Sequence, residues 1–127
     1  MDGRTLVIRQ GEIYWLHLGA AEGSVPAGRR PALVVHHDRF NRSAISTTVV
    51  AAITSNLRLG GMPGNIRLRR GEAGLPRASI VNVSQIRTID RTRLVDRVGV
   101  LGAPRMRDVL RGLALLFGTD EISDAES

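Results

Sequence analysis

The strongest constraint on the fold is a change of hydrophobic period near residue 102. Before that point, apolar and β-branched residues form short runs of strand length, separated by loops rich in Gly and Pro. The predicted strands cover residues 12–18, 31–37, 47–54, 65–69, 79–84 and 97–101, and residues 86–89 extend the fifth past a bend. The pattern favours a mainly β fold of five to seven short strands, a compact barrel or curled sheet.

Beyond Pro104 the apolar residues recur with helical spacing. The helix is predicted to begin near Pro104, which suits a first helical position, and to end before Gly118, a natural stop. Its apolar stripe consists of Met106, Val109, Leu110, Leu113, Leu116 and Phe117. We expect this stripe to pack on the β-structure.

The chain of 127 residues is expected to form one domain over residues 1–119, followed by a disordered acidic tail at 120–127. It contains no run of 18 apolar residues, so no membrane span is predicted. The apolar stretch after the N-terminus is too short for a signal peptide. With no cysteine, the composition fits a cytoplasmic protein and excludes disulfides and thiolate metal sites.

Charge points to a polyanionic partner. All 18 basic residues are arginine, and the last eight residues hold four of the 12 acidic ones. The remaining body therefore carries 18 arginines against eight acidic residues, and nucleic acid is the default partner for such a body. A GC-rich genome accounts for arginine in place of lysine, but not for the net excess. Aromatic residues make up only 3%, which disfavours single-strand binding by base stacking alone.

Two strand ends form the most suggestive polar constellation. Arg30 precedes Pro31 at the start of one apolar run, and Thr54 ends the next. If these strands pair, a guanidinium lies near a hydroxyl, a recurrent way to hold a phosphate. The alternatives are a surface arginine before a strand and a hydroxyl that closes a strand end.

Several segments together carry a resemblance to a known family. They are Arg9-Gln10-Gly11-Glu12-Ile13-Tyr14-Trp15, Gly23-Ser24, Arg29-Arg30-Pro31-Ala32-Leu33-Val34-Val35, Phe40-Asn41, Ala52-Ile53-Thr54-Ser55-Asn56, Met62-Pro63-Gly64-Asn65, Ser79-Ile80-Val81, Gln85-Ile86-Arg87-Thr88-Ile89-Asp90 and Arg93-Leu94. In their order and spacing over residues 9–117 they resemble the MazF/PemK family of toxin endoribonucleases, and most of all its mycobacterial branch.

The resemblance implies an SH3-like barrel with a C-terminal helix, usually a homodimer. It implies sequence-specific cleavage of single-stranded RNA without a metal or other cofactor, and inhibition of translation and growth. The 2′-OH would attack the adjacent phosphorus to give a 2′,3′-cyclic phosphate and a 5′-OH. It also implies neutralisation by a small MazE-like antitoxin.

By the same resemblance, Arg30 and Thr54 match the catalytic arginine and threonine of the family. The RNA-binding positions that match the family are Ser24, Asn41, Ser55, Met62 and Gln85. Arg29 and Arg87 are added for their charge, which suits phosphates, and a solvated surface is their alternative. For Asn41, a cap on the turn after Phe40 is the alternative.

The general base stays unassigned. His17, His36 and His37 are available, but a histidine on a half-buried strand is more often a packed residue than a base. Part of the family carries an Arg-x-Asp pair where this chain has Asn82 and Ser84, so that acid–base pair does not transfer. The glutamate that often follows the serine of the first loop is also missing here.

Two other functions are compatible with the sequence. The gyrase-poisoning toxin CcdB has a related fold and cleaves nothing, but it acts through C-terminal residues that include a tryptophan. No tryptophan follows Phe117 here. The other alternative is a basic nucleic-acid-binding module without turnover, whose binding would weaken with salt.

Overall fold

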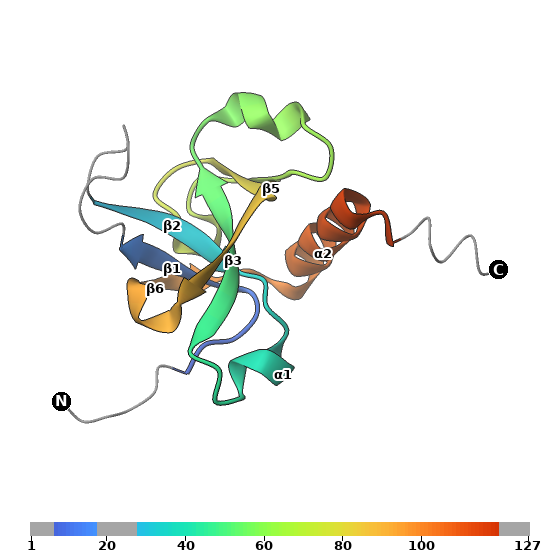
Figure 1. The fold of residues 1–127 in the computed structure, drawn as a ribbon. Coiled ribbons are helices and arrows are strands. Elements are labelled where there is room, and N and C mark those ends of the chain that lie inside the picture. The colour runs from blue at the N-terminus through green and yellow to red at the C-terminus, as the bar shows by residue number, and fades with distance from the viewer. Residues whose placement is uncertain (1–6, 18–27, 120–127) are drawn as a thin grey trace.

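The computed structural model of this chain describes residues 7–17 and 28–119 (Figure 1). Within them the strands are β1 (Glu12–His17), β2 (Arg29–Val34), β3 (Thr47–Thr54), β4 (Ile66–Leu68), β5 (Ser79–Asp90) and β6 (Leu94–Val100). The helices are α1 (Asp38–Asn41) and α2 (Ala103–Phe117), and short 3₁₀ turns η1 (Leu57–Gly61), η2 (Glu72–Gly74) and η3 (Arg91–Arg93) connect the strands. No helix among these residues is long and apolar enough to cross a membrane.

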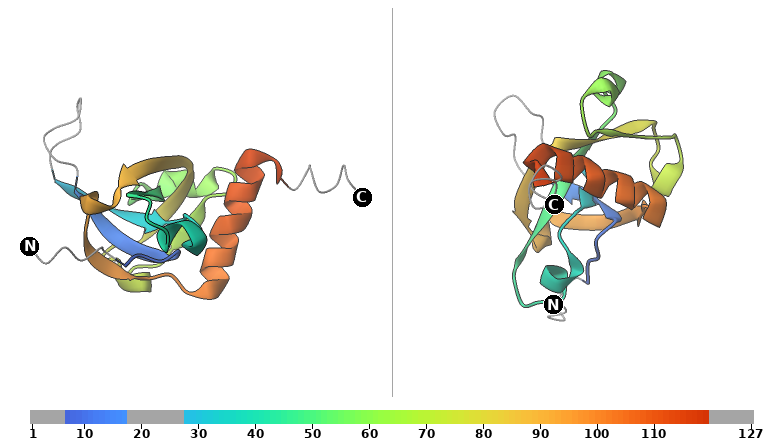
Figure 2. Two further views of the ribbon diagram at one scale, coloured as in Figure 1. Left: turned by 60° about the horizontal axis from the view of Figure 1, so that its bottom comes forward. Right: turned by 90° about the vertical axis from the view of Figure 1, so that its right-hand side faces the viewer.

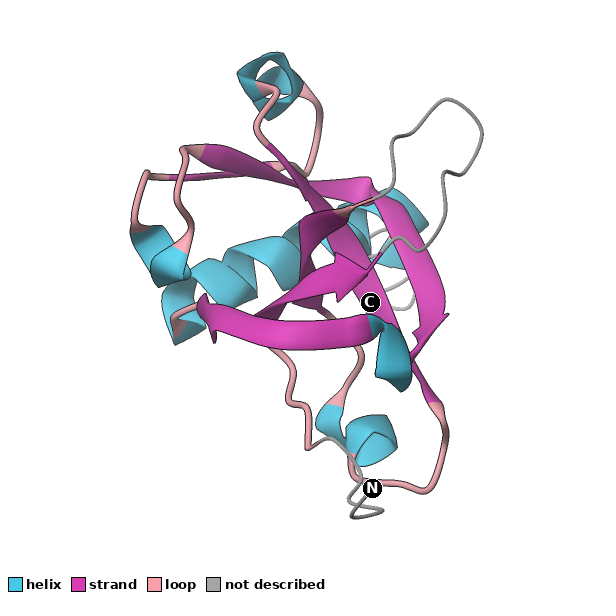
Figure 3. Ribbon diagram, turned by 90° about the vertical axis from the view of Figure 1, so that its left-hand side faces the viewer, coloured by secondary structure: helices cyan, strands magenta, loops and turns pink. Residues whose placement is uncertain are grey.

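The six strands form one sheet in the order β4-β5-β3-β2-β1-β6, and the paired strands run antiparallel. The sheet is strongly curled, and α2 lies across one side of it (Figures 2 and 3). The predicted fold class, mainly β with a C-terminal helix, is confirmed. The tail predicted for residues 120–127 lies outside the described residues.

Two strand limits differ from the prediction by three residues each, and the others differ by less. β2 ends at Val34 rather than at His37, because the N–H groups of Val35 and His36 both donate to the same carbonyl, that of Val49. Two residues facing one is the geometry of a β-bulge, and it ends the ladder. β6 begins earlier than predicted, at Leu94, which pairs with Leu16 of β1.

The bend predicted in the fifth strand is confirmed, and it is a bulge. Ala51 of β3 pairs with Ile86 of β5, but the next residue, Ala52, pairs with Asn82. The Asn82 side chain stabilises the extra residues, since its Oδ1 accepts the Ser84 N–H at 3.3 Å and the Ser84 hydroxyl at 2.8 Å. The bulge therefore redirects the side chains that follow Ser84.

Alternation along the central strands divides the core between two faces of the sheet. One cluster lies under α2 and includes Ile13, Leu33, Ile53, Val83 and Val109. The other consists of Ile8, Tyr14, Leu16, Ala32, Val34, Val50, Ile89 and Leu94. A period of two residues places neighbouring side chains in different clusters, as the apolar runs predict.

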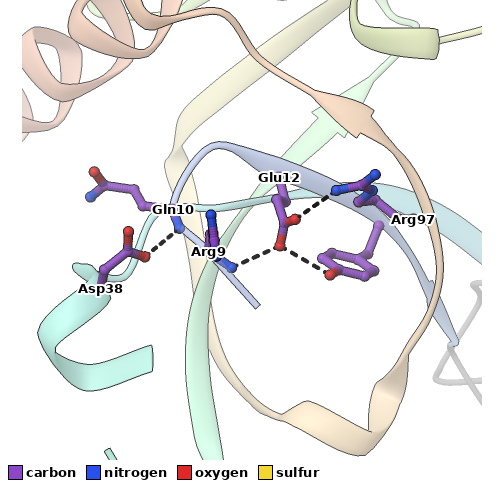
Figure 4. A network of polar contacts seen from close by, with 6 residues as sticks. Arg9, Gln10, Glu12, Asp38 and Arg97 are labelled. Atoms are coloured by element: carbon purple, nitrogen blue, oxygen red, sulfur yellow. Dashed lines mark hydrogen bonds and ion pairs between the residues drawn. The ribbon is translucent and has the colours of Figure 1, made fainter. Parts of the chain in front are cut away.

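A buried carboxylate joins the lead-in segment to β1 and β6 (Figure 4). Glu12 Oε1 accepts the Arg9 N–H at 2.7 Å and the Tyr14 hydroxyl at 3.0 Å, and Oε2 pairs with Arg97 Nη1 at 3.0 Å. All three contacts converge on a side chain that is only 9% exposed, so Glu12 organises this edge of the sheet.

Only part of the predicted helical stripe is buried. Met106 and Val109 lie in the core and Leu113 packs against it, whereas Leu110, Leu116 and Phe117 are exposed. The buried part contains a close approach of backbones, because a Cβ at Gly112 would collide with the Gly64 carbonyl. Gly118 ends the helix at a φ of 73°, as predicted.

Candidate active site

Arg30 lies near the start of β2 with its side chain exposed. It pairs with Leu16 of β1, and strand alternation turns it to the same face as Ala32 and Leu16. Among the described residues its guanidinium has no hydrogen-bond or ion-pair partner. The group is therefore available to a ligand.

Thr54 ends the neighbouring strand β3 and is half-buried. The β2–β3 register pairs Val34 with Val50 and Ala32 with Ala52. Continued by two residues, the same register brings Arg30 opposite Thr54. Directly opposed residues in an antiparallel pair have Cβ atoms about 5 Å apart, which is close enough for both to contact one phosphate.

The Thr54 hydroxyl is oriented by the turn that follows it. The backbone N–H of Asn56 donates to Thr54 Oγ1 at 3.1 Å, and the Asn56 side chain in turn accepts the Arg58 N–H at 3.3 Å. Since one lone pair of the hydroxyl oxygen is occupied, its O–H remains free to donate. The arrangement suits a phosphoryl oxygen as the acceptor.

A first cleft of about 530 Å³ opens beside this pair. Its walls include Leu16, Ala32 and Val50, which belong to the second core cluster, and Gln85 and Arg87 line its polar side. Gln85 is the last unpaired residue of the β5 bulge, just before Ile86, and the bulge places this amide in the cleft.

A second cleft, of about 460 Å³, is bordered by Leu75 of the first core cluster and by Trp15, which alternates along β1 with Tyr14 and Leu16 of the second cluster. It therefore extends to the other face of the sheet. Its polar and aromatic lining consists of Trp15, Arg29, Arg30, Thr54, Ser55, Arg77 and Ser79. The Arg29 guanidinium stands 5.0 Å from the centre of the Trp15 ring, a cation–π contact. The two clefts meet at the strand ends, where Arg30 and Thr54 line both of them.

The structure brings most of the predicted RNA-binding residues to these clefts. Gln85 and Arg87 line the first cleft, and Arg29 and Ser55 line the second. Met62 lines neither; it follows η1 and is 56% exposed. Ser24 lies outside the described residues.

Asn41 is not brought to either cleft. It is only 4% exposed and ends α1, where its Nδ2 donates to the His36 carbonyl at 2.9 Å and to Asp38 Oδ1 at 3.1 Å. Its Oδ1 accepts the Thr48 hydroxyl at 3.0 Å. These bonds match the alternative for Asn41, a cap on the turn after Phe40.

The three histidines lie away from both clefts. His17 is exposed at the end of β1, opposite Arg29. His36 stacks on Phe40 with the rings 4.5 Å apart, and burial, with a smaller effect of the Arg91 charge, lowers the pKa of His36. His37 caps α1, since its Nδ1 accepts the Arg39 N–H at 3.0 Å. Among the residues described, neither cleft is lined by a histidine or a carboxylate.

Trp15 and Arg77 line the second cleft without having been predicted as site residues. Trp15 stood out as the single tryptophan, but nothing in its local sequence distinguishes a groove residue from a core residue. Arg77 lies in a loop whose position depends on how the chain returns from η2 to β5. This path is set by tertiary contacts, and no local sequence pattern predicts it.

Known proteins match this chain over most of its length. Residues 9–117 match the family described as PemK-like, MazF-like toxin of type II toxin-antitoxin system. Endoribonuclease MazF2 of Mycobacterium bovis is 49% identical over 108 residues, which cover 85% of this chain and 95% of that protein. Endoribonuclease MazF6 of Mycobacterium tuberculosis matches with the same identity and coverage.

Solved structures show the same fold. A mycobacterial endoribonuclease in complex with its cognate antitoxin superposes with a TM-score of 0.71 at 23% identity, covering 87% of this chain and 95% of that one. MazF from Deinococcus radiodurans gives a TM-score of 0.69 at 26% identity, with 90% and 99% covered. The family match spans nearly all the described residues, and both strands that carry Arg30 and Thr54 lie inside it. The chain therefore belongs to the PemK-like, MazF-like toxin family of type II toxin–antitoxin systems.

Proposed function

We propose that this chain is a toxin endoribonuclease that cuts single-stranded RNA at specific sequences, by attack of the substrate's own 2′-OH and without a metal. Endoribonuclease activity is supported by curated MazF enzymes that are 49% identical over 85% of the chain. The single structural observation that supports the chemistry is the position of Arg30 and Thr54, which lie across from each other where two clefts meet.

The scissile phosphate would occupy this junction, with the flanking nucleotides in the two clefts. The 2′-oxygen attacks phosphorus and forms a new P–O bond, and the bond to the 5′-oxygen of the next nucleotide breaks. Negative charge builds up on the phosphoryl oxygens in the transition state, and a guanidinium that stays charged and forks across two oxygens stabilises it. The Thr54 O–H donates to one of these two oxygens or holds the 2′-OH in line.

The proton of the 2′-OH must go to a base, and the leaving 5′-oxygen must receive a proton. Since neither cleft holds a carboxylate or an imidazole among the described residues, we assign the first transfer to water. Arg30 is placed to donate the second proton. Gln85 would read a base edge in the first cleft, because an amide both donates and accepts hydrogen bonds.

The test is to map the 5′ ends of RNA after incubation with pure protein in EDTA. We expect cuts at one short sequence, with 5′-OH and cyclic phosphate ends. A 2′-deoxy nucleotide on the 5′ side of the scissile phosphate should abolish the cut, since it removes the nucleophile. If varied single-stranded RNA remains intact in EDTA, the proposal is wrong.

The matched variants are Arg30→Ala and Thr54→Ala, with Arg107→Ala on α2 as the control. Removing one donor to the transition state typically lowers the rate by about 10²–10³. We expect such losses in the first two variants with unchanged folding, and none in the control. RNA binding that weakens with salt but gives no product would favour a non-catalytic binding module, and inhibition in a supercoiling assay would favour a gyrase toxin.

Partners and location follow from family membership and remain part of the proposal. The toxin would act as a homodimer, be neutralised by a cognate MazE-like antitoxin and meet its RNA in the cytoplasm. A mycobacterial neighbour of this fold is known in complex with its cognate antitoxin, which supports a protein partner of that kind.

A further inference from the structure

A third pocket, of about 800 Å³, lies beside α1 and shares no lining residue with the two clefts. We call it the α1 pocket. It is lined by Val7, Ile8, Arg9, Asp38, Asn41, Arg42, Ser43, Ala44 and Arg91. Three of these side chains are guanidinium groups and one is a carboxylate.

Arg91 is the unusual member, because it is only 6% exposed. Its Nη2 donates to the Phe40 carbonyl at 2.9 Å and its Nε to the Thr47 carbonyl at 3.4 Å. A guanidinium has five N–H donors, and those on Nη1 have no partner among the described residues. Nη1 is also not sealed from solvent. The structure therefore keeps a desolvated cation with free donors at the wall of a pocket.

The charges around Arg91 are not balanced. No carboxylate of the described residues lies within ion-pair distance of Arg9, Arg42 or Arg91. Asp38, the one acid in the lining, is already engaged, since its Oδ1 accepts the Gln10 N–H at 2.7 Å (Figure 4). The same oxygen accepts the Asn41 amide at 3.1 Å. A buried charge is costly unless it is paired, so this pocket favours an anionic ligand.

We propose that the α1 pocket binds a backbone phosphate of the RNA, several nucleotides away from the scissile one. Guanidinium groups suit phosphate oxygens through forked hydrogen bonds. This assignment rests on the proposed function, which supplies RNA as the polyanion. The pocket lies at the Thr47 end of β3, and Thr54 lies at the other end of the same strand (Figure 1).

The path between the sites also supports one continuous ligand. Leu16, Ala32 and Val50 in the first cleft and Ile8 in the α1 pocket belong to one core cluster, so both sites border the same face of the sheet. Seven strand residues separate their ends, or roughly 20 Å at the usual rise of a β-strand. An oligonucleotide that only fills the clefts does not reach Arg42, whereas a longer one does.

The experiment measures the affinity of the full-length protein for RNAs of increasing length, extended at either end and made uncleavable by one 2′-deoxy nucleotide. Fluorescence anisotropy is recorded for the unchanged protein and for Arg9→Gln combined with Arg42→Gln. Both side chains are exposed, so the fold is kept. Arg107→Gln, an exposed arginine outside the pockets, is the matched control.

We expect the affinity to rise at one length, and the double variant to bind about tenfold more weakly at and beyond it. On long RNA, the slope of log affinity against log salt concentration should become shallower by about 0.7 for each phosphate that the double variant no longer neutralises. The affinity for short RNA should change little. The control should match the unchanged protein.

An affinity that does not depend on length, or an equal loss on short and long RNA, overturns the inference. The inference is also overturned if the double variant binds RNA like the unchanged protein and only its affinity for an acidic antitoxin falls. If inorganic phosphate perturbs the Arg42 resonances but RNA length has no effect, the site takes free phosphate and the RNA assignment is wrong. Failure of the proposed function gives a different result, since the unchanged protein would then leave short all-ribose RNA uncut.

Discussion

Tyr14 is the single tyrosine of the chain, and its hydroxyl donates to the buried carboxylate of Glu12. Burial, the hydrogen bond to Glu12 and the charge of Glu12 raise the pKa of Tyr14 to about 12, against a small opposite effect of Arg97. The pKa of Tyr14 is higher in the folded protein than in the unfolded chain. The protonated Tyr14 therefore contributes its full stabilisation below pH ~10, and this stabilisation is lost as the pH rises towards 12.

We therefore expect the ultraviolet titration of tyrosinate to have its midpoint near pH 12 in the native protein and near pH 10 in denaturant. No other tyrosine contributes to the signal. Tyr14→Phe should remove this pH-dependent loss of stability. A native midpoint near pH 10 would contradict the buried contact with Glu12.

Asn82 gives a second prediction at the scale of one residue. Asn82→Ala removes the acceptor for both the Ser84 N–H and the Ser84 hydroxyl at the β5 bulge. We expect unfolding in denaturant to show a decrease of about 1–3 kcal/mol in stability, together with weaker sequence selectivity through Gln85. Ser84→Ala removes a single bond at an exposed position and should cost less. Equal stability of the two variants would contradict the role given to Asn82.

Residue types and spacing predicted Arg30 and Thr54 as a phosphate-holding pair, because both mark the ends of clear strand patterns, and only the family resemblance made them a catalytic pair. Gln85 was predicted through resemblance and Arg87 through its charge, since the direction of both side chains depends on a bulge that shifts the register. Asn41 was predicted as a groove residue and lies away from both clefts, for a similar reason. The preference of asparagine for capping a turn is local. Tertiary packing decides which side of the molecule that turn lies on.

Among the elements, α2 depends on one close approach. Gly112 faces Gly64, and a Cβ there would collide with the Gly64 carbonyl. Gly to Ala in a helix normally stabilises by up to about 1 kcal/mol. Here we expect Gly112→Ala to destabilise by about 1–3 kcal/mol, because overpacking outweighs helix propensity. Thermal unfolding measures the change.

The control is Arg111→Ala, at the neighbouring exposed position. Its ion pair with Asp108 is long, at 3.6 Å, and solvent-exposed, so it should change the stability by less than about 0.5 kcal/mol. A stabilised Gly112→Ala protein would show that α2 can move away from the sheet.

Strand existence was predictable from the alternation of apolar residues, and strand limits were not. β2 stops early because two N–H groups share the Val49 carbonyl, and such sharing has no signature in composition. The helix was predicted with nearly correct ends, since Pro104 and Gly118 are themselves chemical boundaries. Its apolar stripe could serve either the sheet or a dimer, because period alone does not tell how far a helix extends past a sheet.

At the scale of the whole molecule, the exposed end of that helix bears on assembly. Leu115, Leu116 and Phe117 present apolar surface, with Phe117 61% exposed. The proposed homodimer needs an apolar contact surface. If a second copy covers this end of α2, Phe117→Asp should raise the dissociation constant of the dimer at least tenfold. The cause is the cost of burying an unpaired carboxylate. Sedimentation over a range of concentrations measures it.

Arg111→Asp places the same side chain at another exposed position of α2, with a larger change of charge, and should leave the dimer intact. An unchanged dimer in the Phe117→Asp protein would place the contact elsewhere. The melting temperature of the dissociated monomer should not differ between the two variants.

The position of Arg30 and Thr54, the proposed reactive pair, also limits how such a protein can be switched off. Thr54 extends from β3 and Arg30 from β2, the third and fourth of the six strands, with paired strands on both sides. Separating them means opening the middle of the sheet, which amounts to unfolding the domain. The folded enzyme therefore has no inactive conformation of the sheet to adopt. Inhibition has to come from another molecule that occupies the two clefts, and it lasts only until that molecule dissociates or is degraded.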